Sequence, residues 1–553
     1  IVEIMSAISN SSVGDHYPAP SGSADDSDGM SSSDYYYDYD YGDDDEDKEE
    51  EDDDGSDGYE EEEEEEDKEE GHDLGGEVRS YEEAAPKRQK TDRISTLSDN
   101  VLLHILSFLK VKEIIRTGTL SKRWQHLWPS VSTLEFNMPN LDTNREFVAN
   151  VCRTLALCDS SYIKRFEVGV YYKKRFASDV NLWLRFATRK KVEDLRLNCF
   201  FPGAIYPLPQ YLYTNSSLTK LDLVYCHFKP KGVISWISLK SLSLNVMELR
   251  DETIGKILSG CPVLESLDLC NCHGMNCLNI NSASLRKLMI HGYSNRINVL
   301  EVSAPNIQSL AILGHFYENK FRLLDVSSLV DVELGFYRTH PHDEEGYDEF
   351  AGPRNLLIES LEKLHHLENL KLGQKCIEII SIMEVKGLPS PPSKCKCLML
   401  DVHITKWTLP GIASLLESSP DIDTLIIKRS LHYPEYDEFK REKFIRENFS
   451  NSFNFDGERY WTSIERSFKC LVLNLKIVKI VDFAFVGGHS GFELQFVQFL
   501  LQNALALEKM VINAQRVDQK QNSPCCTSHE LLEVMQNLLS FPRSSQHAVV
   551  IFT

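Results

Sequence analysis

The sequence predicts an α/β protein in which a short three-helix segment precedes a solenoid of repeated parallel strands and follows a disordered acidic tail. Three observations predict this fold: the acidic residues gather in the first 90 positions, apolar residues near Leu97–Trp128 have helical spacing, and an apolar template recurs through the rest of the chain. At 553 residues the chain is too long for one ordinary core, so a repeat array or several domains are expected.

The acidic tail comes first. Residues 1–90 hold 34 acidic against 6 basic side chains, a net charge of −28, which leaves +3 of the total of −25 for residues 91–553. Such a segment cannot bury enough apolar surface to offset chain entropy, so we expect residues 1–90 to be disordered. A basic cluster near its end predicts nuclear import, and a solvated charge run that counterbalances the acid is the alternative. This cluster consists of Pro86, Lys87, Arg88 and Lys90.

The chain gives no sign of secretion or membrane insertion. It opens without a secretory signal, and no run approaches the roughly 18 apolar residues that a membrane helix needs. We therefore expect a soluble protein of the nucleus and/or cytoplasm that has no membrane partner. The fourteen cysteines are then expected to be reduced thiols and not a disulfide framework.

Residues 91–138 predict three short helices. Ser98 and Asp99 stand where capping side chains belong, just before an apolar face at helical spacing. A second short helix is expected around Ile114 and a third near Ser121. Three such helices are below the size at which a core is normally self-sufficient, so a partner is implied. The apolar face of the first helix comprises Val101, Leu102, Ile105, Leu106 and Leu109.

The phrases "DRISTLSDNVLLHILSFL" and "RTGTLSKRWQHLWPSVSTLEF" make this segment resemble an F-box, the motif through which ubiquitin-ligase subunits bind a Skp-type adaptor. The family usually has proline where this chain has Ser98 and Lys110, and the loss of both prolines predicts a looser element. The alternative is that the helices only cap the next domain. The resemblance implies that adaptor contacts or their immediate support come from Leu97, Val101, Leu102, Ile105, Leu109, Ile114, Leu120 and Trp124.

The rest of the chain, with its regular part at 139–470, repeats the template apolar-x-x-apolar-x-apolar. Between Leu218 and Leu329 the copies start 21, 25, 21, 22 and 22 residues apart, which are leucine-rich-repeat periods. Each copy predicts one parallel strand on the concave side of a solenoid, with helices and loops on the convex side. Cys226 and Cys272 each stand three residues after the last leucine of a copy. Such repeats commonly place Cys or Asn there, where the side chain bonds exposed backbone groups at the turn. The copies start at Val131, Ile163, Val192, Leu218, Leu239, Leu264, Leu285, Ile307, Leu329, Leu367, Cys395, Ile422, Leu475 and Leu507.

The return segments between copies differ in kind. Residues 250–262 and 411–421 predict helices, whereas the longer inserts 337–354 and 429–461 predict loops at a binding face. In the first insert, the pair His340 and His342 beside three carboxylates suggests a metal, but a solvated acidic loop is the favoured interpretation. The second insert is rich in Tyr and Phe and is a contact candidate; a helix packed on its own solenoid is the alternative.

Residues 471–553 resemble the FBD region that ends many plant F-box/leucine-rich-repeat proteins. The stretches that carry this resemblance are "LKIVKIVDFAFVGGHSGFELQFVQFLLQNALALEKMVI" and "FPRSSQHAVVIF". Leu494, Val497 and Leu501 set a helical face, and "LEKMVI" adds another strand copy. The resemblance implies the last repeats and a cap that closes the open core.

Motifs for catalysis and cofactor binding are missing from the sequence. It has no phosphate-binding loop, no nucleophile elbow and no His-Glu-x-x-His zinc motif. Cys525 and Cys526 have His529 nearby, but a polar surface loop explains this better than a nucleophile does. The pairs Cys270–Cys272 and Cys395–Cys397 lack partners at zinc-finger spacing. We expect no catalytic residue, no cofactor and no metal.

The resemblance implies a non-catalytic substrate-recognition subunit of an SCF-type (cullin-RING) ubiquitin ligase. Its F-box would bind a Skp-type adaptor and through it a cullin and a RING protein, while the repeats hold an unknown protein target; no direct nucleic-acid partner is expected. One alternative is a nuclear leucine-rich-repeat protein whose acidic tail binds histones or other basic proteins by charge. Another is a receptor that holds a small molecule on the concave face.

Overall fold

The computed structural model describes residues 94, 96–138, 144–200, 204–292, 299–314, 320–336, 351–388, 390–429, 454–483, 490–514 and 528–553. From Ser98 onward these residues belong to one compact unit. The acidic tail 1–90, its basic cluster Pro86–Lys90 and most of the two inserts lie outside the described residues. Within the described part of the chain, no helix is long and apolar enough to cross a membrane.

The predicted three-helix segment is present. Ser98 and Ser121 are the N-cap residues of the first and third helices, as the sequence indicates. The short connections between the helices follow from the tight turns at Ser107–Leu109 and Gly118–Leu120, whose amides bond back to the preceding turn. The elements are α2 (Asp99–Leu106), α3 (Val111–Thr117), α4 (Lys122–Leu127) and a 3-10 turn, η1 (Trp128–Ser130).

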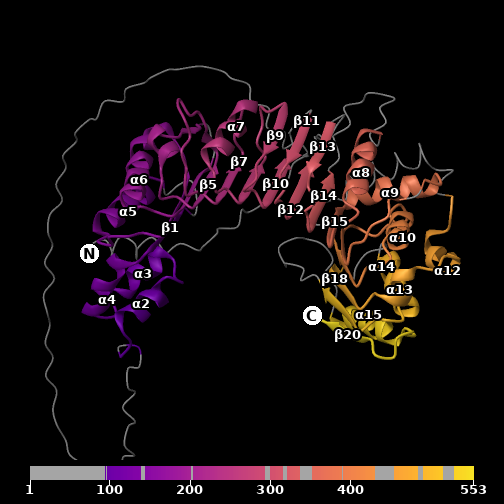
Figure 1. Ribbon diagram of the computed structural model, residues 1–553. Coiled ribbons are helices and arrows are strands. Elements are labelled where there is room, and N and C mark those ends of the chain that lie inside the picture. Colours follow the sequence, from indigo (N-terminus) through magenta and orange to yellow (C-terminus); the bar gives the residue numbers. More distant parts are fainter. Residues whose placement is uncertain are drawn as a thin grey trace, which may run out of the picture. The chain divides into compact units, whose positions relative to one another are not determined.

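One fifteen-stranded parallel sheet runs through the rest of the unit (Figure 1). All fourteen copies of the apolar template form strands of this sheet, and the C-terminal "VVIF" adds the fifteenth. The strands are β1 (Thr133–Asn137), β2 (Arg165–Tyr171), β3 (Asp194–Phe200), β5 (Lys220–Val224), β7 (Ser241–Asn245), β8 (Ser266–Cys270), β10 (Lys287–Gly292), β12 (Ser309–Gly314), β14 (Asp331–Phe336), β15 (Asn369–Gly373), β16 (Cys397–Asp401), β17 (Thr424–Lys428), β18 (Ile477–Phe483), β19 (Lys509–Ala514) and β20 (Val549–Phe552).

The register of the strands stacks equivalent repeat positions. Leu221 pairs with Leu195 on one side and with Leu242 on the other, so the last two apolar positions of each template line up across the sheet. These side chains are at most 1% exposed. Since side chains alternate along a strand, the residue between them lies on the opposite, concave face. One continuous core therefore lies behind the sheet.

Helices cover the convex side of the sheet over much of its length (Figure 1). The predicted helices at 250–262 and 411–421 are confirmed as α7 and α10. The convex elements are α5 (Asn144–Leu157), η3 (Lys174–Phe176), α6 (Ala177–Arg189), η4 (Gln210–Thr214), α7 (Asp251–Gly260), α8 (Ala351–Lys363), α9 (Gln374–Val385), α10 (Leu409–Ser418), η5 (Gly457–Arg459), α12 (Tyr460–Ser463), α13 (Lys469–Leu473), α14 (Ser490–Asn503) and α15 (Ser528–Ser540).

Between β8 and β14 the return segments form strands instead of helices, which the sequence patterns did not indicate. They make a three-stranded parallel sheet of β9 (Cys277–Asn281), β11 (Val299–Ser303) and β13 (Lys320–Asp325). In β9 and β11 apolar residues alternate with polar ones, and the inward residues, such as Leu278 and Ile280, are fully buried. A two-stranded pair, β4 (Tyr206–Pro207) with β6 (Cys226–His227), completes the strands.

The turn after the central strands repeats from one copy to the next. Tyr225, Val246 and Asn271 each follow a strand with φ between 50° and 55°, a left-handed backbone that non-glycine residues rarely adopt. Their amides donate to carbonyl oxygens of the next repeat at 3.1, 2.8 and 2.6 Å. The thiols of Cys226 and Cys272 then donate to strand carbonyl oxygens at 3.4 and 3.3 Å. The predicted structural role of these two cysteines is confirmed.

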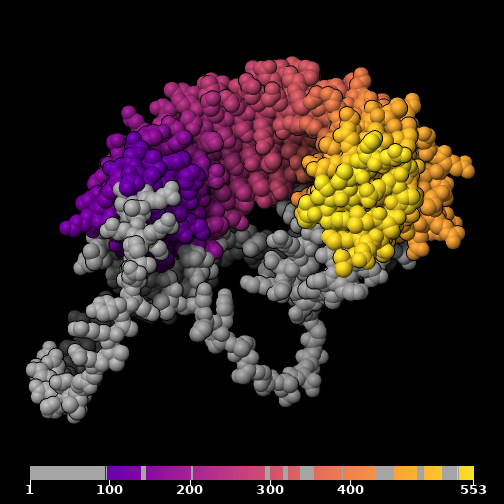
Figure 2. Space-filling model, turned by 90° about the horizontal axis from the view of Figure 1, so that it is seen from below, coloured from indigo at the N-terminus to yellow at the C-terminus, as the bar shows by residue number. Residues whose placement is uncertain are grey.

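The two ends of the large sheet belong to the two ends of the chain. The three-helix segment packs on the β1 end through α3, and β18–β20 with α14 and α15 form the other end (Figure 2). In α14, Val497 and Leu501 of the predicted helical face are 1% exposed, and Leu494 is half-buried.

Candidate functional site

The three-helix segment has a filled core of its own. Leu102 and Leu106 of α2 are 0% exposed, and Ile114 of α3 (2%) and Trp124 of α4 (6%) are buried as well. A charged pair ties the start of α2 to α4: the guanidinium of Arg123 donates to Asp99 Oδ1 from Nε at 2.9 Å and from Nη2 at 2.5 Å. The core therefore fixes the orientation of the side chains that remain outside.

Several large apolar side chains of the same segment face solvent. Val101 (44% exposed), Ile105 (39%) and Phe108 (75%) stand at i, i+4 and i+7, which places them along one side of α2 and its following turn. Leu109 is 37% exposed, and Leu120, between α3 and α4, is 68% exposed. Large apolar residues that are gathered on a small element and cannot enter its filled core are typical of a protein-binding surface.

The eight residues that the F-box resemblance implies divide into two groups. Leu102, Ile114 and Trp124 are buried and support the fold of the segment. The other five are exposed or half-buried and are available for contact. The available group comprises Leu97, Val101, Ile105, Leu109 and Leu120.

Sequence reasoning missed Phe108, the most exposed apolar residue of the segment. Its ring packs edge-on against His104, with the centroids 4.9 Å apart, so it is held in place although it faces solvent. Its spacing of three residues from Ile105 was the available signal. The exposed charges of Lys110 and Glu113 follow directly in sequence and give the apolar surface a polar rim.

The two positions where the family usually has proline both have proline-like backbone angles. Ser98 has φ −68° and Lys110 has φ −69°, close to the −65° at which a proline ring fixes the backbone. The amide of Lys110 donates to Glu113 Oε2 at 3.1 Å, a bond that a proline could not make. The chain thus reaches the same conformation at both positions without the ring.

The concave face carries ion pairs near its N-terminal end. Arg165 of β2 bonds Asp194 of β3 through Nε at 2.9 Å and lies 3.5 Å from Glu135 of β1. Arg196 pairs with Glu167 at 3.8 Å. These charges neutralise one another along neighbouring strands, so they order the concave surface more than they attract a ligand.

Two carboxyl groups on the same face, those of Asp222 and Asp268, form no ion pair with a described residue, although cations lie near enough to influence both. Burial raises the pKa of Asp222, although the charge of Arg196 and a hydrogen bond from Ser243 oppose this rise. Burial and the charge of Asp222 raise the pKa of Asp268, although the charge of Lys287 opposes this rise. The Oδ1 atom of Asp268 is buried without a hydrogen-bond partner. The middle of the concave face therefore favours a partner that donates hydrogen bonds.

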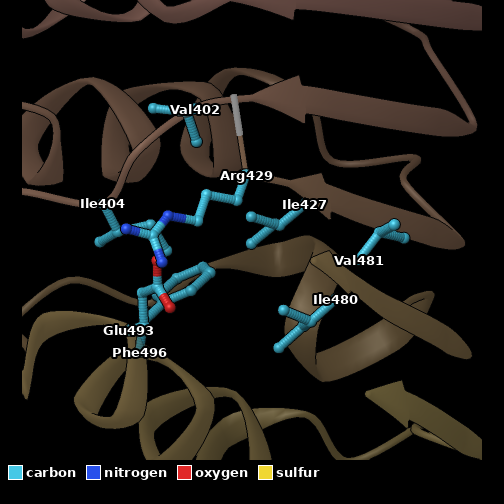
Figure 3. A pocket seen from close by; sticks show the side chains of 8 residues that line it. All are labelled: Val402, Ile404, Ile427, Arg429, Ile480, Val481, Glu493 and Phe496. Carbon is cyan, nitrogen blue, oxygen red and sulfur yellow. The ribbon is translucent and has the colours of Figure 1, made fainter. Parts of the chain in front are cut away.

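A small cavity lies between the strands β16–β18 and helix α14 (Figure 3). Arg429 and Glu493 point toward one another across it, and Ile404, Ile427 and Phe496 line it. The Arg429 guanidinium lies 3.3 Å from His403 Nε2. The cavity volume of about 10 Å³ has room for one water molecule and is too small for an organic ligand.

The cysteines of the solenoid are mostly buried. Burial raises the pKa of the Cys261, Cys376 and Cys470 thiols to about 12 and that of Cys226 well above its ordinary value, so these thiols stay protonated. In the described ranges, no group of three or more His, Cys, Asp and Glu side chains is arranged to hold a metal ion.

Several residues considered from the sequence cannot be placed. His340 and His342 lie outside the described residues, as do Cys525 and Cys526. Nothing in the structure therefore bears on the metal or nucleophile interpretations of these positions.

Two family models match the sequence. The F-box domain model matches residues 94–136, and the LRR domain model of At1g61320/AtMIF1 matches residues 160–548. The first match covers the three helices and β1, and the second covers the strands from β2 to the end of α15. The first model thus ends within β1, the first strand of the sheet, and the second begins shortly before β2.

Three similar curated proteins come from Arabidopsis thaliana. The putative F-box/LRR-repeat protein At3g18150 is 31% identical over 439 residues, which are 77% of this chain and 87% of that protein. F-box/LRR-repeat protein At3g03360 is 31% identical over 355 residues, 62% of this chain and 71% of that protein. The putative F-box protein At1g49610 is 33% identical over 351 residues, 61% of this chain and 84% of that protein.

Proposed function

Because the chain belongs to the F-box/LRR-repeat proteins, we propose that it is a non-catalytic substrate-recognition subunit of an SCF-type ubiquitin ligase. In this proposal the F-box binds a Skp-type adaptor, which links it to a cullin and a RING protein. The leucine-rich repeats hold a protein target, and the raised local concentration of target lysines near the conjugating enzyme is what the chain contributes.

The observation that carries the proposal is the exposed apolar row Val101, Ile105 and Phe108 beside a filled core. A self-sufficient helical cap would turn these side chains inward, whereas here the core positions are already occupied by Leu102 and Leu106. Burial of the row against a second protein removes apolar surface from water, at about 25 cal/mol per Å². In this proposal the exposed row contacts the adaptor, and the buried residues Leu102 and Leu106 hold the row in place.

A reconstitution with the full chain tests this function. The chain is mixed with purified Skp-type adaptor, cullin and RING protein, and co-precipitation of the cullin is measured for the wild type and for Val101→Asp/Ile105→Asp. A matched control is Val233→Asp/Ile237→Asp, which makes the same chemical change at two solenoid positions that are 82% and 55% exposed. We expect the control to recover cullin and the F-box variant to lose it.

Two results would count against the proposal. Cullin recovered equally with the F-box variant would place the contact elsewhere on the chain. If the folded wild type bound no adaptor at all, binding of histones or other basic proteins through the acidic tail would become the leading account. That account predicts a steep loss of binding with rising salt, since exposed charges are screened within about 10 Å at 0.1 M salt.

The target contact belongs, in the same proposal, to the concave face of the repeats. Its support is the pair of half-buried carboxyl groups of Asp222 and Asp268, which lie on this face and form no ion pair with a described residue. Residues 471–553 are proposed to be an FBD-like end of the solenoid, because β18–β20 continue the sheet while α14 and α15 cover its last part. The raised pKa values of the buried thiols support a role without nucleophilic cysteine chemistry.

We also propose that the protein works in the nucleus and/or cytoplasm. The support is the basic cluster Pro86–Lys90 in the sequence. A fluorescent fusion of the full chain should lose nuclear signal when Lys87, Arg88 and Lys90 are replaced by alanine. An unchanged distribution would mean that the cluster is only a solvated charge run.

A further inference from the structure

Helix α6 lies on the convex side of the sheet (Figure 1). Exposed cations gather at both of its ends. Three of them precede the helix, two lie in its second half and one follows its end, and an exposed leucine stands between the two groups. We refer to these residues as the α6 surface. The α6 surface consists of Lys173, Lys174, Arg175, Leu182, Arg185, Arg189 and Lys191.

The charge of the α6 surface is not balanced within the described part of the chain. None of its six cations forms an ion pair with a carboxylate of a described residue; Arg175 lies over the Phe176 ring at 4.9 Å, and Arg185 meets the neutral phenol of Tyr211. The carboxylate of α6 itself, Asp179, is half-buried and faces Cys152 of α5 at 3.9 Å. On helix α7, by contrast, Lys256 is paired with Glu252 at 3.3 Å.

Helix stability does not explain where these cations lie. The helix dipole favours positive charge at the C-terminal end, which accounts for Arg189 and Lys191. The same dipole disfavours Lys173, Lys174 and Arg175 at the N-terminal end. These three cations gain no stabilisation from the helix dipole and pair with no carboxylate of a described residue; among them only Arg175 has a favourable contact, with the Phe176 ring.

Leu182 gives the surface an apolar centre. It is 54% exposed, although the inward positions of α6, such as Trp183 and Leu184, are fully buried. Arg185 and Arg189 follow Leu182 by three and seven residues, so all three lie on one face of the helix. The outer face of α6 therefore offers an apolar contact flanked by positive charge.

We propose that the α6 surface binds a partner protein through an acidic segment that also carries an exposed apolar side chain. Carboxylates of such a segment neutralise the cations, and its apolar residue covers Leu182. A nucleic-acid backbone offers no aliphatic group to match Leu182, and the acidic tract at residues 43–70 of this chain contains no aliphatic side chain. The α6 surface is separate from the F-box and the concave face, so this proposal does not rest on the adaptor or target contact.

Fluorescence anisotropy with the full chain tests the proposal. The labelled probes are a short acidic peptide with two central leucines, the same peptide with serines in place of the leucines, a peptide of residues 43–70 and a single-stranded DNA oligonucleotide. The variants are Arg185→Glu/Arg189→Glu and Leu182→Ala. Lys240→Glu/Lys256→Glu is the control, because it makes the same change in net charge at two exposed lysines of neighbouring repeats.

The leucine peptide should bind the wild type and the control equally. Its affinity should fall at least about tenfold with Arg185→Glu/Arg189→Glu and roughly fivefold with Leu182→Ala or with the serine peptide. The proposal is wrong if the control variant loses as much affinity as Arg185→Glu/Arg189→Glu does, or if Leu182→Ala has no effect on affinity. Either result would indicate nonspecific attraction between charges. Tighter binding of the DNA or of the 43–70 peptide would likewise overturn it, as would no binding of the leucine peptide.

Discussion

Replacing Ser98 by proline should stabilise the F-box, whereas the same change at Lys110 should not. Both residues have φ within a few degrees of the proline value, so the ring fits either position and removes freedom from the unfolded chain, a gain of about 0.4–1 kcal/mol. The Ser98 side chain makes no capping bond that would be lost. At Lys110 the amide bond to Glu113 Oε2 disappears, which costs about 0.5–1.5 kcal/mol and cancels the gain.

Hydrogen exchange of the amides in α2 and α3 measures this difference in the full chain. A gain of this size slows exchange through local opening about two- to fivefold in Ser98→Pro, while Lys110→Pro should leave exchange unchanged or faster. Glu113→Gln, which weakens the same capping bond without a ring, serves as the control for Lys110. Faster exchange in Ser98→Pro would contradict this prediction, since it would mean that the backbone before α2 is not shaped for proline.

Three further predictions follow from burial and packing. Leu102→Ala should destabilise the F-box by about 2–5 kcal/mol because it leaves a cavity at a fully buried site, while Val101→Ala should change stability little. Hydrogen exchange measures both, and an equal loss of amide protection in the two variants would contradict the assigned faces of α2. In α7, Gly260→Ala should lower the free energy of unfolding by about 1–3 kcal/mol, because its Cβ would lie 2.3 Å from a backbone oxygen. Gly255→Ala, whose Cβ would meet nothing within 4 Å, should raise it by about 0.5–1 kcal/mol. Chemical denaturation measures both changes, and a change of the same sign in the two variants would contradict this prediction. Burial raises the pKa of Asp268 above its ordinary 3.8, so ionisation of this carboxyl lowers the stability of the fold as the pH rises through the folded pKa. Asp268→Asn should therefore raise the melting temperature at pH 7 and not at pH 3. A higher melting temperature at both pH values would contradict this prediction.

The strands were predictable because each depends on a local pattern. In a copy such as Leu218, Leu221 and Leu223, three apolar residues at fixed spacing specify both the strand and the side chains that enter the core, and all three are at most 1% exposed. The constant interval between copies then fixes the stacking, since each strand can bury its face only against its neighbours.

The orientation of α2 was harder to derive. Val101 and Leu102 are adjacent in sequence and both belong to a broad apolar face, so spacing alone does not say which one enters the core. The choice depends on where α3 and α4 pack, which is a tertiary property. The three-stranded sheet at β9, β11 and β13 was missed for a related reason, because a short stretch such as Leu278–Ile280 satisfies a strand or a loop equally well.

A calorimetric titration of the full chain with purified Skp-type adaptor tests the adaptor contact most directly. We expect a one-to-one complex whose affinity falls at least about 100-fold in Val101→Asp/Ile105→Asp, because two charges would be buried without partners. We expect no change in affinity in Val233→Asp/Ile237→Asp. An adaptor that binds wild type and F-box variant with the same affinity, or that does not bind the wild type, would contradict the assignment of the exposed row of α2 as the adaptor contact.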